Sequence, residues 1–569
     1  MNMKEIIRCA KGDLPADLLL TGGRLLNVFT GDILPGHIAI KDGIIVGIGD
    51  YQSTNKVDLK GGTAVPGFID AHVHIESSMT EVDAFARAIV PHGTTTVVAD
   101  PHEIANVSGT DGIRYMLAAS AGLPLNVYFM LSSCVPATDM ETTGARLTAD
   151  DLRPFIHEKR ILGLAEMMNF PGVVSAEEEV LRKIDMAHAA RKPVDGHSPG
   201  LSGAGLNAYV AAGISSDHEC TTLEEAREKL QAGMHIMVRE GTAAKNLSTL
   251  LPVVDSFTCR RMMWCTDDRH PHDLLAEGHV DFIVRNAVRM GLDPVIAVQM
   301  ATLNPAEYFG LKHLGAIAPG RRADIIVIDN LKKFSIAQVY SGGQLVAEGG
   351  RMLKNDGPET PIEPPRVMKV KPETIDFSIP ARGRFIRVIE IVPQQIVTRA
   401  VTDNVRIENG LAVSDPGRDI LKIAVVDRYS GAGRIGLGFV RGLGLKKGAL
   451  ASSVAHDAHN IIVAGVDDSD LSVALRSIVE IGGGLAAVSE GRPLAVLPLP
   501  IGGLMSDAPI EKVCQHIDAL LEAAGQLGSF LENPFMTLSF LALPVIPQLK
   551  ITDHGLVDVD KFQSVSLFI

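Results

Sequence analysis

The alternation of short apolar runs with amphipathic stretches constrains the fold of this chain most strongly. Between residues 66 and 314, runs typical of strands alternate with helical stretches; examples are "TTTVVAD" (94–100), "LNVYFML" (125–131) and the helical "SAEEEVLRKIDMAHAARK" (175–192). Such alternation over a long segment is typical of a parallel α/β domain. We therefore expect an α/β protein in which residues 66–314 form a (β/α)8 barrel.

Short β segments lie on both sides of this middle section. "DLLLTGGRLLNV" (17–28) and "HIAIKDGIIVGIGD" (37–50) are apolar runs broken by Gly-Gly and Asp-Gly, which indicates hairpins. The same pattern of short apolar runs separated by turn residues occurs in "GAIAPGRRADIIVIDN" (315–330). We expect residues 1–65 and 315–356 to pair into one composite β-sandwich domain that flanks the barrel.

The end of the chain is predicted to form a further domain. The proline-rich stretch "GPETPIEPPRVMKVKP" (357–372) is typical of a linker. Strand runs and two helical stretches follow it, so we expect residues 373–569 to form a C-terminal α+β domain.

Composition excludes several classes of protein. The formal charge is -14 and no basic stripe is present, which disfavours nucleic-acid binding. No run approaches the roughly 20 apolar residues of a membrane span. The six cysteines are scattered without a CxxC pair, and no signal peptide is evident, so we expect reduced thiols in a cytoplasmic protein.

Polar side chains gather where the predicted barrel strands end. In "IDAHVHIESSMT" (69–80), His72 and His74 are two residues apart, so both point to the same face of a strand. Further along, the predicted strands end at a glutamate, two histidines and two aspartates: Glu166, His197, His218, Asp267 and Asp268. Because the carboxyl ends of barrel strands meet at one mouth, we expect these side chains to converge there.

The residue types indicate a metal centre. Imidazole and carboxylate without thiolate suit zinc, iron or manganese. Four histidines and two carboxylates exceed what one tetrahedral zinc uses, and they suffice for two ions if one carboxylate bridges. Two such ions can share a hydroxide and lower its pKa towards neutrality.

Several segments carry a resemblance to a known family. "PGFIDAHVHIESS" and "GAIAPGRRADIIVID" resemble the amidohydrolase superfamily. "LAEMMNFPGV", "CTDDRHPHDLLAEGHVDFIVR" and the C-terminal "VAHDAHNIIVAGVDDSDL" resemble its bacterial adenine deaminase branch. The resemblance covers nearly the whole chain.

The resemblance implies a ligand set. His72, His74 and Asp267 would hold one ion, and His197 and His218 would hold the other. Many superfamily members bridge their ions with a carboxylated lysine on the fourth strand, where this chain has Glu166. The implied cofactors are two divalent ions, manganese or iron first and zinc as a third option.

The resemblance also implies a reaction, the hydrolytic deamination of adenine to hypoxanthine and ammonia in purine salvage. A metal-bridging hydroxide would attack the ring carbon that carries the amine. Asp267 would carry the proton to the leaving amine, and Glu219 is the candidate for protonating the ring nitrogen, against a purely orienting role. The expected partner is a small purine, and the expected assembly is a homodimer or a higher homo-oligomer.

Five further residues are candidates for binding the substrate: His102, Glu103, Asp268, Arg239 and Ser77. Each has an alternative interpretation. His102, Glu103 and Arg239 are equally consistent with structural roles, Asp268 could support the metal ligands, and Ser77 could cap the next helix.

Other conspicuous residues have plainer interpretations. His456 and His459 could contribute to the mouth of the pocket or to a dimer contact, but the favoured interpretation is a structural turn. We expect His270 and His272 to be surface histidines and Trp264, the only tryptophan, to be core.

Two rival functions stay open at this point. One is another binuclear amidohydrolase, which opens a cyclic amide or removes an N-acyl group. The other is a catalytically inactive metal-binding scaffold. Release of ammonia from adenine separates both rivals from deamination.

Overall fold

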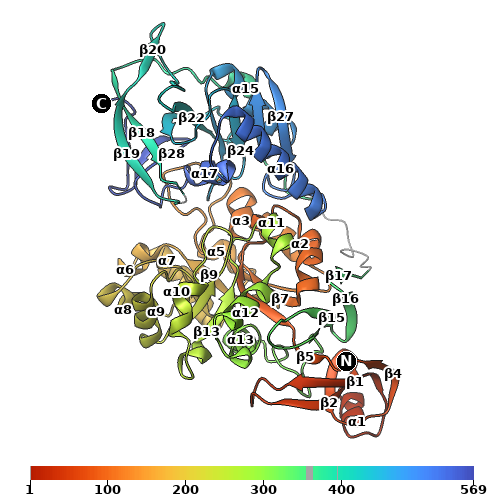
Figure 1. Cartoon of the computed structure of the whole chain (residues 1–569). Helices are drawn as coiled ribbons and strands as arrows, with labels where there is room; N and C mark the ends of the chain where they lie inside the picture. The colour runs from red at the N-terminus through yellow and green to blue at the C-terminus, as the bar shows by residue number, and fades with distance from the viewer. Residues whose placement is uncertain (1, 354–362, 394) are drawn as a thin grey trace.

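A computed structural model describes residues 2–353, 363–393 and 395–569 of the chain (Figure 1). The first part of the predicted linker, 357–362, lies outside the described residues. In Figure 1 the N-terminal strands lie at one end of the molecule, the barrel segment in the middle and the C-terminal residues at the other end.

Eight parallel strands form the centre of the middle segment. β6 to β10 make one sheet and β11 to β13 another, and all pairs within both sheets are parallel. Single parallel bridges, Val73 to Asp267 and Val194 to Ile214, join the two sheets at both edges and complete the ring. The expected parallel α/β arrangement is therefore confirmed, with two weakly paired seams. The strands are β6 (Phe68–Val73), β7 (Thr94–Ala99), β8 (Asn126–Leu131), β9 (Ile161–Met167), β10 (Val194–Gly196), β11 (Ser216–Asp217), β12 (His235–Arg239) and β13 (Met262–Cys265).

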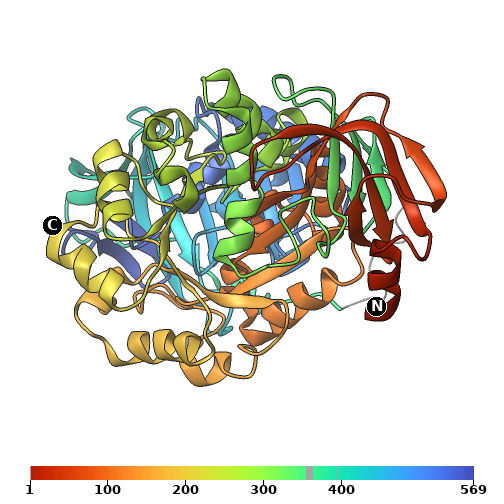
Figure 2. The ribbon, with the colours of Figure 1, turned by 90° about the horizontal axis from the view of Figure 1, so that it is seen from below.

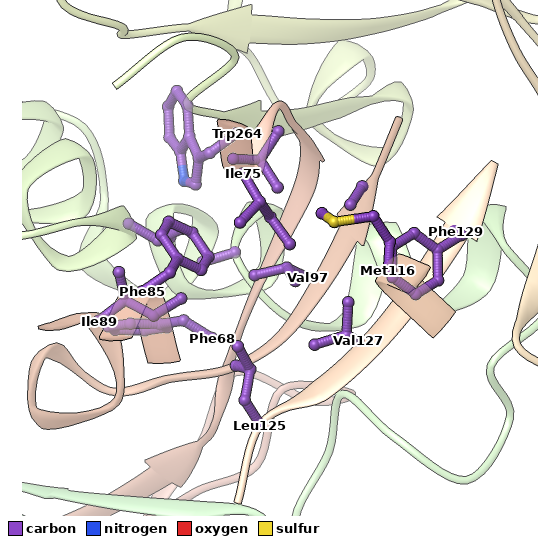
Figure 3. Close-up of a cluster of buried hydrophobic side chains, with 14 of the residues drawn as sticks. Phe68, Ile75, Phe85, Ile89, Val97, Met116, Leu125, Val127, Phe129 and Trp264 are labelled. Carbon is purple, nitrogen blue, oxygen red and sulfur yellow. The ribbon is translucent and has the colours of Figure 1, made fainter. Parts of the chain in front are cut away.

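The strands are buried on both faces because helices cover the outside and side chains fill the inside. Every residue of β6, β7 and β9 is buried. Trp264 on β13 is fully buried, and its indole N–H donates to the carbonyl of Ala297 at 2.9 Å, so its prediction as a core residue is confirmed. Figure 3 shows Trp264 in one cluster of buried side chains with Phe68, Phe85 and Val97. A packed core here fixes where the strand ends point.

Helices follow the strands around the ring. α3 (His102–Ser108) begins directly after β7, and the predicted helix at 175–192 is present as α7 (Glu178–Ala189). The remaining helices of the segment are α2 (Val82–Ile89), α4 (Thr110–Ala119), α5 (Ala149–Leu152), α6 (Phe170–Val174), α8 (Gly203–Ala211), α9 (Leu223–Gln231), α10 (Leu247–Leu250), α11 (Pro271–Ala276), α12 (Val280–Arg289), α13 (Pro294–Met300) and α14 (Leu303–Tyr308).

A nine-stranded sheet combines the two ends of the barrel sequence. β5 (Thr63–Pro66) pairs antiparallel with β14 (Ile325–Ile328), which places the chain before and after the barrel side by side. Figure 2 shows these segments together at one side of the molecule. The helix α1 (Met3–Ala10) packs on this sheet. The other strands are β1 (Ala16–Leu26), β2 (Ile33–Lys41), β3 (Ile44–Ile48), β4 (Ser53–Asp58), β15 (Ile336–Ser341), β16 (Gln344–Glu348) and β17 (Arg351–Met352).

The C-terminal residues build an eight-stranded, mainly antiparallel sheet. The helices α15 (Asp468–Glu480) and α16 (Ile510–Leu527) pack on this sheet, and the shorter α17 (Pro534–Phe540) also contacts it. The sheet contains β18 (Phe385–Ile391), β19 (Thr398–Asn404), β22 (Ile420–Val426), β23 (Ile435–Arg441), β24 (Ala449–Ser452), β25 (Ile461–Gly465), β26 (Gly484–Ser489) and β27 (Arg492–Pro498). The smaller strands are β20 (Arg406–Glu408), β21 (Leu411–Val413), β28 (Leu549–Thr552), β29 (Gly555–Asp558) and β30 (Gln563–Val565).

The C-terminal part lies against the barrel on the side of α2, α3 and α11 (Figure 1). α16 contacts both α11 and α2, and the backbone amide of Ser506 donates to the carbonyl of Met79 at 2.8 Å. These contacts cover the end of the barrel at which the parallel strands finish. Among the described residues, no helix combines the length and apolar character needed to cross a membrane.

Candidate active site

β6 brings His72 and His74 to the mouth of the barrel. Both are buried, and their Nε2 atoms lie 3.1 Å apart. Nδ1 of His74 is 3.0 Å from the backbone carbonyl of Asp100, which can only accept a hydrogen bond. The ring proton of a neutral His74 therefore sits on Nδ1 and leaves the Nε2 lone pair free, the arrangement that metal-binding histidines use.

Glu166 on β9 lies between two pairs of histidines. Its Oε1 faces Nε2 of His74 at 3.2 Å and Nε2 of His72 at 3.8 Å. Its Oε2 faces Nδ1 of His197 at 2.7 Å and Nε2 of His218 at 3.3 Å. The carboxylate thus offers one oxygen to each pair, as a bridge between two ions requires.

Asp267 follows β13 and faces the first histidine pair. Its amide donates to the carbonyl of His72 at 3.0 Å, and its Oδ1 lies 3.3 Å from His72 Nε2 and 3.1 Å from His74 Nε2. Its φ of +56° is left-handed, which is uncommon for a residue other than glycine. Asp268 points elsewhere, to the hydroxyl of Ser77. Of the two consecutive aspartates, Asp267 alone contacts the histidine pair.

Arg239 connects the two carboxylates predicted to handle protons. One of its terminal nitrogens is 2.8 Å from Oδ2 of Asp267, and the guanidinium also binds both oxygens of Glu219. Glu219 is in turn 3.4 Å from Nε2 of His218. Burial raises the pKa of Glu219, but His197 and Arg239 outweigh it and hold the carboxyl below its usual range. In this arrangement Glu219 is a carboxylate that accepts a proton before it can donate one.

His102 and Glu103, at the start of α3, lie beside the metal ligands. Nδ1 of His102 is 3.4 Å from Oε1 of Glu166, and its Nε2 is 3.5 Å from Oε1 of Glu103. His102 thus stands between two buried carboxylates. Both residues lie near the histidine cluster, as do Arg239, Asp268 and Ser77.

The donor set fits divalent metal. The groups of potential ligands around this point include four in which the ligand atoms lie within 4.8 Å of one another: His72 with His74 and Asp267, His72 with Glu166 and His218, His74 with Asp100, His102 and Glu166, and His197 with His218 and Glu219. All of these residues are buried except His197 and Glu219, which are partly buried. Burial raises the pKa of Glu166, but His197, His218 and His74 outweigh it and keep the carboxyl well below its usual range. An ionised carboxylate amid imidazoles is the state in which such groups bind metal.

The structure adds to one interpretation of the other histidines and corrects another. Residues 456–458 form a turn, as favoured from the sequence, and the rings of His456 and His459 also contact Glu103 of the barrel, with His456 Nδ1 2.9 Å from Glu103 Oε1. His270 is buried and not on the surface, because the C-terminal part covers it. The surface prediction holds for His272, whose side chain is 41% exposed.

Sequence reasoning missed two buried acids at this mouth. Asp100 directly follows β7. It lies 3.2 Å from Nδ1 of His102 and accepts a hydrogen bond from the hydroxyl of Ser132 at 3.0 Å. Glu76 lies in the short helical turn after β6 and accepts from the amide of Ile104. The position of Asp100 at a strand end was a usable signal, whereas nothing in the sequence distinguished Glu76 from a loop carboxylate.

Comparison with known proteins places these residues in a family context. Residues 63–346 match the amidohydrolase family, and residues 395–563 match the adenine deaminase C-terminal domain. The chain is 54% identical over 564 residues to "Adenine deaminase" of Desulfatibacillum aliphaticivorans, covering 99% of both chains. It is 50% identical to "Adenine deaminase 2" of Carboxydothermus hydrogenoformans and 47% identical to "Adenine deaminase" of Dehalococcoides mccartyi, again over 99% of each.

Proposed function

Since this chain belongs to the adenine deaminase family of amidohydrolases, we propose that it hydrolyses adenine to hypoxanthine and ammonia. The family implies a divalent metal centre and a small purine substrate. The observation that supports this function best is Glu166, whose two oxygens face two separate pairs of histidines.

We assign two ions to this site, with manganese or iron preferred. His72, His74 and Asp267 would hold one ion, His197 and His218 the other, and Glu166 would contribute one oxygen to each. When bound, the ions would activate water for attack on the ring carbon that carries the amine. The permanent charge of Glu166 replaces the carboxylated lysine of other amidohydrolases and needs no carbon dioxide.

Asp267 is the proposed proton carrier of the reaction. Its carboxylate takes the proton of the attacking water and delivers it to the leaving amine. Arg239 holds Oδ2 of Asp267 at 2.8 Å, so the same carboxylate stays oriented while it exchanges protons. Arg239 thereby orients both Asp267 and Glu219.

Glu219 is the proposed carrier for the ring nitrogen next to the attacked carbon. Because its pKa is lowered, Glu219 is a carboxylate that would first take one of the two protons of the attacking water and pass it to the ring nitrogen, while Asp267 carries the other proton to the leaving amine. Ser77, Asp268, His102 and Glu103 remain proposed contributors to the purine pocket.

The wider context is also part of the proposal. The enzyme would act in purine salvage in the cytoplasm as a homodimer or a higher homo-oligomer. We divide the chain into a composite β-sandwich (1–65 and 315–356), a barrel (66–314), a linker (357–372) and a C-terminal α+β domain (373–569). The pairing of β5 with β14 supports the first of these units.

The experiment is an assay of purified, manganese-loaded protein with adenine, in which released ammonia and the ultraviolet spectrum are followed together. Equal amounts of hypoxanthine and ammonia are expected. Adenosine, guanine and a cyclic amide serve as comparison substrates. Turnover of the cyclic amide without turnover of adenine would replace deamination by the ring-opening alternative.

A further inference from the structure

The ligands assigned to the two ions are held together in different ways. The amide of Asp267 donates to the carbonyl of His72 at 3.0 Å, and the amide of His74 donates to the carbonyl of Asp267 at 3.1 Å. The main chain therefore fixes the ligands of the first ion. His197 and His218, assigned to the second ion, follow β10 and β11, which have three and two residues and share a single bridge.

A buried carboxylate spans this seam between β10 and β11. Asp217 is the last residue of β11, and its Oδ2 accepts from the amide of Ser198 at 2.9 Å and from the hydroxyl of the same residue. Its Oδ1 accepts from the amide of Glu219 at 2.6 Å. Ser198 directly follows the ligand His197, whereas Asp217 and Glu219 stand on either side of the ligand His218. One carboxylate thus joins the two chain segments that carry the ligands of the second ion.

Lys229 on α9 reaches the same two segments from outside the barrel ring. Its ammonium donates to the carbonyl of Ser198 at 2.7 Å, to Oδ2 of Asp217 at 3.2 Å and to Oε1 of Glu225 at 2.8 Å. The side chains of Lys229 and Asp217 are both fully buried. We call Lys229, Asp217 and Glu225 the Lys229 network. Its ammonium contacts the backbone of one ligand segment and a side chain of the other.

Glu225 adds a second connection between the loops. Its Oε1 accepts from the amide of Gly200 at 2.8 Å, and its Oε2 accepts from the amide of Thr221 at 3.1 Å. Gly200 lies in the loop after His197, and Thr221 lies in the loop after His218. Both carboxylates of the Lys229 network therefore join the same two loops, and both share one ammonium.

The burial of these charges indicates a role in geometry more than in stability. A buried ion pair contributes little net stability, because the loss of hydration offsets the attraction between the charges. The best-attested use of such groups is to fix one arrangement of the chain where others are open to it. The Lys229 network has this position, since it crosses a seam where the strands are too short to fix the loops by backbone pairing.

We propose that Lys229 sets the separation of His197 and His218 and thereby the affinity of the site for the second ion. The proposal rests on the proposed function, because it assumes a centre of two ions. Among the described residues, the Lys229 ammonium contacts no assigned metal ligand, so Lys229 is a positioning residue. The first ion should not depend on it, because the main chain joins the ligands of that ion.

The test titrates metal-free wild type and Lys229→Met with Mn²⁺ in equilibrium dialysis. Methionine keeps the length of the side chain but has no ammonium. The Kd of the second ion should rise about 10- to 100-fold, as is typical when a group that orients a ligand is removed. The Kd of the first ion should stay unchanged. The manganese concentration that gives half-maximal ammonia release should rise by the same factor.

Electron paramagnetic resonance gives a readout that does not depend on activity. Two Mn²⁺ ions that share the carboxylate of Glu166 are spin-coupled, whereas one ion per chain gives the hyperfine spectrum of isolated Mn²⁺. At a manganese concentration that fills both sites of the wild type, Lys229→Met should show the isolated spectrum. The coupled spectrum should return at saturating manganese, because every ligand is still present.

Lys422→Met is the matched control. Lys422 is also a buried lysine, in β22 of the C-terminal sheet, and its ammonium donates to the carbonyl of Phe377 at 2.8 Å and to Asp468. This variant should lower the thermal midpoint but leave both manganese affinities unchanged. Ser198→Ala keeps every charge of the Lys229 network and repeats the titration if Lys229→Met does not fold. It should weaken the second ion by a smaller factor.

Two unchanged affinities in the folded variant would overturn the proposal. So would an equal weakening of both ions, or fewer than two ions in the wild type. If the wild type bound two ions but released no ammonia from adenine, deamination would fail instead. The titration and the spectra need no substrate, so they would still decide the role of Lys229.

Discussion

Two buried carboxylates at the barrel mouth are each surrounded by histidines, yet the two surroundings favour different chemistry. Glu166 faces His74, whose Nδ1 lies against the Asp100 carbonyl at 3.0 Å. Glu103 faces His459, whose Nδ1 lies against the Ala455 amide at 3.2 Å. A carbonyl leaves Nε2 as a lone pair for metal, whereas an amide leaves Nε2 as a donor. The backbone group that faces Nδ1 thus decides whether the histidine can bind a metal or instead donates a hydrogen bond to the carboxylate.

The two carboxylates also differ in where their partners come from. The histidines and the aspartate around Glu166 all belong to strands and loops of the barrel: His72, His74, His197, His218 and Asp267. Glu103, His456 and His459, here called the Glu103 cluster, join residues 356 positions apart and meet only where the barrel and the C-terminal part are docked. Changes at Glu166 should therefore remove metal, whereas changes at Glu103 should loosen docking.

The largest effect is expected for Glu166→Ala. Removal of the bridging carboxylate should cost at least one of two ions per chain and lower kcat by about 10³-fold or more, because the ions supply several kcal/mol of activation. Metal analysis after reconstitution and the ammonia assay measure both. Retention of two ions with full activity would exclude Glu166 as the bridge.

The second-largest effect is expected for Asp267→Asn. It should reduce kcat roughly 10²- to 10⁴-fold, as expected when a proton carrier is lost. The amide keeps one oxygen, which can still face the histidine pair, while its NH2 group replaces Oδ2 opposite Arg239. KM should change less than kcat, because the side chain keeps its shape and its position at the barrel mouth. A pH–rate profile of the variant should lose the limb that Asp267 provides. A profile identical to that of the wild type would argue against its role as proton carrier.

Glu103→Gln should have a smaller effect of another kind. Two ions should remain, while the free energy of unfolding should fall by about 1–3 kcal/mol because two buried histidines lose a charged acceptor. Denaturant unfolding and metal analysis test this together. Loss of metal with unchanged stability would mean that the Glu103 cluster binds an ion after all.

The smallest effect is a dependence of stability on pH. Because Glu103 raises the pKa of His456 to about 9, the stabilisation is complete below the unfolded value near 6.5 and is lost as pH rises through 9. The stability advantage of the wild type over His456→Phe should shrink by roughly 1–3 kcal/mol between pH 6.5 and pH 10. A constant difference across this range would show that Glu103 does not charge His456.

Much of the barrel and its ligands could be predicted from local patterns. The spacing of His72 and His74 fixes their shared face, and Glu166, His197, His218 and Asp267 each follow an apolar strand run. Parallel strands bring such positions to one edge without further information. The weak seam between β10 and β11 could not be predicted, because these strands are only three and two residues long.

The contacts of the C-terminal part lay beyond sequence reasoning. His456 and His459 read as a turn because flanking strand runs gave no sign of Glu103, and His270 read as a surface residue because only the docked C-terminal part buries it. No periodicity links residues so distant along the chain. Such pairings depend on how two packed units dock.

The sequence by itself determined that His72, His74, Glu166, His197, His218 and Asp267 meet at the barrel mouth, because strand periodicity and strand ends are local properties. Only the tertiary structure decided what each histidine there presents to its carboxylate. That choice depends on whether a carbonyl or an amide faces the other ring nitrogen, as it does for His74 and His459. The direction of these hydrogen bonds depends on the folded backbone. It makes one histidine a possible metal ligand and the other a hydrogen-bond donor to a carboxylate.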